Sequence, residues 1–157
     1  MNLNQLNILL ADDDIDDCVF FNQAVKELLL PGNFKAVHDG EQLMQYLTNE
    51  TNKLPHVLFL DLNMPRKNGF ECLSEIKCNE KLKQLPVVIY STSFEQGMVS
   101  QLYQHGAQYF IRKPSEFAQF KKIIHQTLGL MSTTLPTDNN GNITQPKEEN
   151  FVIKLEK

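Results

Sequence analysis

Five short apolar runs, separated by longer amphipathic segments, constrain the fold of this chain more than any other feature. Each run has the length of a β-strand, and between the runs apolar residues recur every three or four positions, which is the helical period. Strands that alternate with helices indicate βα units, and such units build a parallel sheet. We therefore predict an α/β fold. The predicted strands lie near residues 7–11, 34–38, 56–61, 86–91 and 108–112.

The helices of this pattern begin at recognisable polar or glycine residues. We expect them to start after Asp14, at Asp39-Gly40, near Gly69, after Ser93 and near Ser115, where Ser115 is a candidate N-cap. Gly129 is expected to end the last helix, because glycine is common just past a helix C-terminus.

The composition fits one domain with a short appendage. The chain has 157 residues and a net charge of −4, so no basic face favours nucleic acid as a partner. Its apolar runs are too short to cross a bilayer, and the first residues lack the pattern of a signal peptide. Three cysteines without a CxxC spacing favour free thiols in a reducing compartment. We expect a cytoplasmic protein that spans no membrane.

Reactive side chains follow four of the predicted strands. Asp12 and Asp13 follow the first strand, Asp61 the third, Ser91 the fourth and Lys113 the fifth. In an open parallel sheet, ligands bind outside the carboxyl ends of the strands, so these groups should meet at one edge. An acidic pair, a further aspartate, a hydroxyl and a lysine in that order indicate a magnesium-dependent site that accepts a phosphoryl group.

The acidic segment 12–17 has other interpretations. It begins like a calcium-binding EF-hand loop, but Asp17 stands where glycine is needed and Gln23 where a bidentate glutamate belongs. It also contains the DxD spacing of haloacid dehalogenase-like phosphatases, without the flanking Thr or Val of that family. Acids in a first helical turn are also favoured by the helix dipole alone, which explains Asp16 and Asp17 better than Asp12 and Asp13.

Taken together, these residues resemble the receiver domain of two-component response regulators, the CheY-like family, over about residues 6–130. The phosphorylated aspartate of that family lies in a D-x-x-M-P pattern, which here is Asp61 to Pro65. The resemblance implies a flavodoxin-like doubly wound parallel sheet of five βα units with strand order 2-1-3-4-5. The other family markers correspond to the acidic pair Asp12 and Asp13, the hydroxyl of Ser91, the Lys113-Pro114 pair and the switch aromatic Phe110.

The resemblance also implies a mechanism. Asp61 would take a phosphoryl group from a histidine kinase or a phosphotransfer protein. Lys113 and Ser91 would contact phosphoryl oxygens, and Ser91 and Phe110 would move as the switch that a downstream target protein reads. Such a protein signals, and it catalyses only its own phosphorylation and dephosphorylation. Mg²⁺ would be held directly by Asp13 and Asp61, through water by Asp12, and by the backbone carbonyl of Asn63.

Three further expectations complete this prediction. We expect a receiver domain in residues 1–130, and in residues 131–157 a linker and strand-like tail without an output domain. The apolar tail Phe151–Leu155 should pack along a sheet edge of its own domain or of a dimer mate, so a homodimer is possible. We also expect a cis peptide bond at Lys113-Pro114. The alternatives are a magnesium-dependent phosphatase with an aspartyl nucleophile and a constitutive binding module with the receiver fold.

Overall fold

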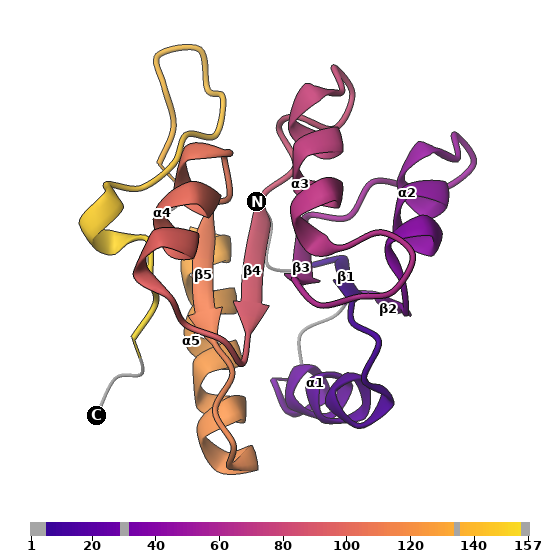
Figure 1. Cartoon of the computed structure of the whole chain (residues 1–157), viewed down its shortest axis with the longest axis vertical. Helices are drawn as coiled ribbons and strands as arrows, with labels where there is room; N and C mark the ends of the chain where they lie inside the picture. Colours follow the sequence, from indigo (N-terminus) through magenta and orange to yellow (C-terminus); the bar gives the residue numbers. More distant parts are fainter. Residues whose placement is uncertain (1–5, 29–31, 134–135, 155–157) are drawn as a thin grey trace.

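The computed structural model describes residues 6–28, 32–133 and 136–154. These residues form one five-stranded sheet of order β2-β1-β3-β4-β5, in which every neighbouring pair is parallel (Figure 1). The predicted fold class and strand order are therefore confirmed. The strands are β1 Ile8–Ala11, β2 Phe34–Val37, β3 Val57–Asp61, β4 Val87–Ser91 and β5 Tyr109–Arg112. The helices are α1 Ile15–Glu27, α2 Gly40–Thr48, α3 Gly69–Cys78, α4 Gln96–Gln104 and α5 Phe117–Thr133, with the 3₁₀ turn η1 at Glu148–Asn150.

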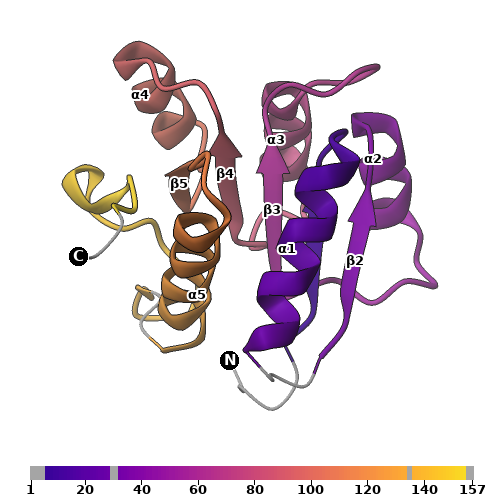
Figure 2. The same cartoon turned by 90° about the horizontal axis from the view of Figure 1, so that it is seen from below.

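Helices cover both faces of the sheet (Figure 2), and an apolar layer lies between the helices and the sheet on each face. One layer packs α1 and α5 against one face, and the other packs α2, α3 and α4 against the opposite face. Alternate residues of each strand contribute to the two layers, because successive side chains of a strand point to opposite faces. The central strands β1, β3 and β4 are consequently buried along their whole length.

Three helices begin at polar residues that cap them. The side chains of Asp14, Asp39 and Asn68 each accept a hydrogen bond from a backbone N–H in the first turn of α1, α2 and α3. In α3, the side chain of Glu71 also accepts from the backbone N–H of Asn68, which completes a capping box. These caps fix the helix starts directly after the loops that leave the carboxyl ends of the strands.

Two expectations from the sequence are wrong. Helix α5 continues through Gly129 to Thr133, because Leu128 and Met131 on its inner face are buried in the apolar layer and sustain another turn. No cis peptide bond occurs among the described residues, so Lys113-Pro114 is trans. The trans form is the commoner state of X-Pro bonds, and here it still lets the Lys113 side chain reach the acidic residues.

Residues 136–154, which we call the C-terminal arm, return to the free edge of β5 (Figure 1). The backbone N–H of Phe110 donates to the carbonyl of Phe151 at 3.0 Å, and the N–H of Ile153 donates to the carbonyl of Phe110 at 2.8 Å. Phe151 is buried, and its ring lies 5.2 Å from that of Tyr103 in α4. The arm thus adds a short parallel bridge to the sheet, as the apolar tail predicts, while Leu155 lies outside the described residues.

In the part of the chain that the structure describes, no helix has both the length and the apolar character needed to cross a bilayer.

Candidate phosphoryl-transfer site

Asp61 is the last residue of β3, and the residue after it is hydrogen-bonded to the start of α3. The N–H of Gly69 donates to the carbonyl of Leu62 at 3.0 Å. A Cβ atom at Gly69 would lie only 2.4 Å from the carbonyl oxygen of Asp61, so only glycine allows this close approach. The 61–69 loop therefore closes tightly over the strand end and keeps the Asp61 side chain at the edge of the sheet.

Asp12, Asp13 and Asp61 form a carboxylate cluster at this edge. One carboxylate oxygen from each lies within 4.8 Å of the others. Asp12 is fully buried and Asp61 is 6% exposed, whereas Asp13 is exposed to solvent. Carboxylate oxygens are the donors that hard divalent cations prefer, and grouped carboxylates repel without a positive charge between them. The residues present therefore fit a divalent cation.

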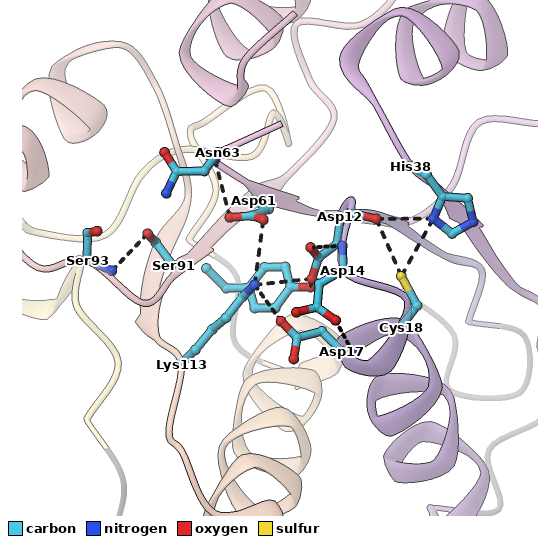
Figure 3. A network of polar contacts seen from close by, with 11 residues as sticks. Asp12, Asp14, Asp17, Cys18, His38, Asp61, Asn63, Ser91, Ser93 and Lys113 are labelled. Carbon is cyan, nitrogen blue, oxygen red and sulfur yellow. Dashed lines mark hydrogen bonds and ion pairs between the residues drawn. The ribbon is translucent and has the colours of Figure 1, made fainter. Parts of the chain in front are cut away.

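Lys113 reaches into this cluster from the loop after β5 and lies between three carboxylates (Figure 3). Its Nζ is 3.1 Å from an oxygen of Asp12, 2.9 Å from Asp17 and 3.6 Å from Asp61. The Lys113 side chain is only 7% exposed. A buried ammonium at these distances partly compensates the negative charge and places a cation beside the Asp61 carboxylate.

The close packing of these groups changes their proton affinity. Burial raises the pKa of the Asp61 carboxyl to about 7; the Lys113 ammonium opposes this rise and Asp12 adds to it. For Lys113, burial lowers the pKa, but the carboxylates of Asp61, Asp12 and Asp17 outweigh that effect and raise it above the ordinary lysine value. The lysine therefore stays charged at neutral pH. Without a metal ion, the Asp61 carboxyl with its pKa of about 7 binds a proton near neutral pH.

Ser91 and Asn63 flank Asp61 on the side away from Asp12 (Figure 3). The buried Ser91 hydroxyl oxygen accepts a hydrogen bond from the N–H of Ser93 at 3.1 Å, and the N–H of Asn63 donates to Asp61 at 3.4 Å. Ser91 and Asn63 also line a pocket of about 480 Å³ between the loops that follow β3 and β4. Ser91 therefore borders an open space next to the loop that follows Asp61.

Phe110 lies apart from the charged cluster, in β5. Its ring is fully buried, 5.9 Å from the ring of Phe94 and 6.5 Å from that of Phe151. The resemblance implies that this ring moves as part of the switch, and in the structure the ring is buried in the interior. Burial of Phe110 is therefore not by itself a mark of one signalling state.

Sequence reasoning misses two members of the site. It assigns Asp17 to the helix dipole, yet the Asp17 carboxylate makes the shortest ion pair of Lys113. It gives no polar role to Tyr90, which donates its hydroxyl to Asp12. Asp17 lies in the first turn of α1, four residues after Asp13, and this closeness to the acidic pair is the signal that could have found it. For Tyr90 no such local signal exists, because its partner is 78 residues away.

Comparison with known proteins assigns the chain to a family. The family model of the response regulator receiver domain matches residues 8–125, about three quarters of the chain. This chain belongs to the response regulator receiver family. As a receiver, it is 30% identical over 135 residues to the response regulator Rcp1 of Synechocystis sp., covering 82% of this chain and 92% of that protein.

Solved receivers share the same architecture. The Mn²⁺-bound form of Rcp1 superposes with a TM-score of 0.77 and 27% identity, over 83% of this chain and 97% of that one. The phosphorylated cyanobacterial phytochrome response regulator RcpA gives a TM-score of 0.78 and 29% identity, over 84% and 97%. The family places this chain in two-component signalling and agrees with the resemblance seen in the sequence.

Proposed function

We propose that this receiver accepts a phosphoryl group on Asp61 from a histidine kinase or phosphotransfer protein, in a Mg²⁺-dependent reaction, and signals through protein contacts. The observation that carries the proposal is the position of Asp61. Asp61 is the last residue of β3, and its carboxylate belongs to the acidic cluster, 3.6 Å from the Lys113 ammonium. The next residues of its loop, Leu62 and Asn63, line the same pocket as Ser91.

In the transfer, a carboxylate oxygen of Asp61 attacks the phosphorus of a phosphohistidine. The phosphorus–nitrogen bond breaks, and its electron pair returns to the leaving imidazole. Such a transfer requires mainly positioning and charge stabilisation. Lys113 supplies the cation that turns from the carboxylates to a phosphoryl oxygen, and the Ser91 hydroxyl donates to another.

The carboxylates of Asp12, Asp13 and Asp61 with the backbone carbonyl of Asn63 would hold the Mg²⁺ ion. A cation held there would supply positive charge that offsets the negative charge of the phosphoryl oxygens. Rcp1, a relative of the same fold, has a structure in a Mn²⁺-bound form, which supports a divalent cation as the ligand of this receiver.

The phosphoryl group adds charge and acceptor oxygens at one end of β4 and β5. Movement of Ser91 toward these oxygens would shift the loop after β4, which carries Phe94. The ring of Phe94 contacts that of Phe110, so the shift would reach β5. We propose that this change alters the surface around α4 and β5, which a downstream target protein or a second copy then binds.

The test is labelling with acetyl phosphate and with a phosphorylated histidine kinase, each with Mg²⁺ and with a chelator. We expect wild-type protein to be labelled only with Mg²⁺ and Asp61→Asn not to be labelled. Asp16→Asn is the matched control, because Asp16 is an exposed acid in the first turn of α1, close in sequence to the acidic pair, and it should be labelled like wild type. Labelling that is unaffected by chelation, or a labelled Asp61→Asn, would overturn the proposal.

A further inference from the structure

Tyr90 places a polar group in the interior of the molecule. It lies in β4 beside Ser91 but points to the opposite face of the sheet, into the apolar layer beneath α1 and α5. The side chain is fully buried, and its ring lies 6.1 Å from that of Phe21. A phenylalanine would fill the same apolar space, so packing alone does not account for the hydroxyl.

The hydroxyl and the ring of Tyr90 each contact a charged group of the site. The hydroxyl donates to Asp12 Oδ2, and the Lys113 ammonium lies 4.2 Å from the centre of the ring, in cation–π geometry. Asp12 Oδ2 also accepts from Lys113 at 3.1 Å, and Asp12 Oδ1 accepts from the N–H of Asp14 at 3.0 Å. Three donors therefore fix the Asp12 carboxylate. Two of them belong to Tyr90 and Lys113, which also contact each other.

These contacts have different fates when Asp61 is phosphorylated. Lys113 must turn toward a phosphoryl oxygen and so weaken its bond to Asp12 Oδ2. Tyr90 belongs to the buried central strand β4, so its hydroxyl should keep its position. It can therefore keep the buried Asp12 carboxylate satisfied and oriented, whereas an unpaired buried carboxylate would be costly.

We infer that Tyr90 is a positioning residue of the phosphoryl-transfer site. Its hydroxyl holds Asp12 in the orientation that a divalent cation needs, and its ring supports the Lys113 ammonium. The inference rests on the proposed function, since it assigns Tyr90 a part in assembling that site. Groups that orient metal-binding carboxylates typically contribute about 10- to 100-fold to metal affinity.

The test compares Tyr90→Phe with wild type and with Tyr109→Phe. Tyr109 is a matched control, because it is buried in the same apolar layer, in the neighbouring strand. Mn²⁺ affinity is measured by electron paramagnetic resonance of free Mn²⁺ in the absence of any phosphodonor. We expect Tyr90→Phe to bind Mn²⁺ about tenfold more weakly, and Tyr109→Phe to bind it like wild type.

A second measurement separates positioning from a structural effect. The rate of labelling by acetyl phosphate is followed as a function of Mg²⁺ concentration. For Tyr90→Phe, we expect the half-saturating Mg²⁺ concentration to rise about tenfold, with the rate at saturation nearly unchanged because the ring beneath Lys113 remains. A lowered saturating rate with an unchanged half-saturation point would instead mark a purely structural role and overturn the inference.

The outcomes also separate this inference from the proposed function. Wild-type protein that binds Mn²⁺ more tightly than Tyr90→Phe but is never labelled would leave the positioning role intact and overturn the proposed function. Wild-type protein that is labelled with Mg²⁺, together with Tyr90→Phe that binds Mn²⁺ equally well, would overturn the inference alone.

Discussion

At the scale of single residues, the balance between Lys113 and the surrounding carboxylates determines how the site behaves without a metal ion. The single ammonium of Lys113 forms ion pairs with Asp12, Asp17 and Asp61, so it compensates only part of their negative charge. The raised pKa of Asp61 is the consequence. A bound cation should therefore stabilise the folded protein.

This imbalance predicts a pH-dependent stability. The pKa of Asp61 rises from its ordinary value of 3.8 to about 7 in the folded protein. The folded state therefore holds the proton more tightly than the unfolded state, and ionisation of Asp61 lowers stability progressively as the pH rises from about 4 to 7. With a chelator present, Asp61→Asn should stabilise the protein by roughly 1–4 kcal/mol at pH 8 and have almost no effect near pH 4. Urea unfolding at both pH values measures this. An equal increase in the free energy of unfolding at both pH values, or a decrease at pH 8, would contradict the raised pKa of Asp61.

Removal of the Lys113 ammonium should lower the free energy of unfolding, whereas Asp61→Asn should raise it. Lys113→Met leaves Asp12 and Asp61 buried without their cation, and breaking a buried pair in this way costs about 3 kcal/mol. Added Mg²⁺ should restore part of that loss, because a bound cation replaces the missing charge. Lys122→Met, at an exposed position of α5, is the control and should change the free energy of unfolding by less than about 0.5 kcal/mol. Equal losses in the two variants would refute this account of the charge balance.

The residues of the site differ in how far sequence alone could find them. Asp12, Asp61 and Lys113 each lie at or directly after the end of a strand, so the parallel sheet is enough to bring them together. Asp17 lies near the acidic pair in the first turn of α1, so its position could have suggested a role, but its partner Lys113 is fixed only by the packing of α1 against the loop after β5. The bond from Tyr90 to Asp12 depends on how β4 packs beside the loop after β1, and no local pattern encodes it.

At the scale of elements, the strands were predictable to within a residue because each is a short apolar run bounded by polar residues. The end of α5 was not, because tertiary burial of Leu128 and Met131 outweighs the local preference of Gly129 to stop a helix.

Two glycines in helices predict opposite effects of substitution by alanine. Gly129 lies inside α5, and a Cβ atom added there would meet no other atom within 4 Å, so Gly129→Ala should stabilise the protein by about 0.5–1 kcal/mol. Gly69→Ala forces its Cβ against the backbone of Asp61 and should destabilise the protein. Thermal unfolding of both variants measures this. A loss of stability in Gly129→Ala would mean that the helix does not continue through this residue.

The C-terminal arm predicts a further stability effect. Phe151 is 1% exposed between Tyr103 and Phe110, so Phe151→Ala should cost about 3 kcal/mol. It should also speed proteolysis between residues 136 and 150. Glu149→Ala is the control, since Glu149 is exposed in the same arm. If Phe151→Ala matched this control in both assays, the arm would contribute nothing to the fold.

At the scale of the whole molecule, the parallel sheet explains why groups from distant parts of the sequence share one site. Strand order 2-1-3-4-5 places β1 and β4 on either side of β3, so Asp12 and Ser91 flank Asp61, and β5 next to β4 brings Lys113 within reach. The same order leaves β5 at an edge, where the arm pairs with Phe110. The proposed phosphoryl-transfer site and the candidate output surface are thus connected through β4 and β5.

The most direct test of this account is the location of the phosphoryl group. Wild-type protein is labelled with acetyl phosphate and Mg²⁺, the acyl phosphate is reduced with borohydride, and the modified residue is identified by peptide mass spectrometry. We predict a single modified residue, Asp61, and no modified peptide in Asp61→Asn. Modification of Asp12 or Asp13 in the wild-type protein, with Asp61 unmodified, would contradict the account.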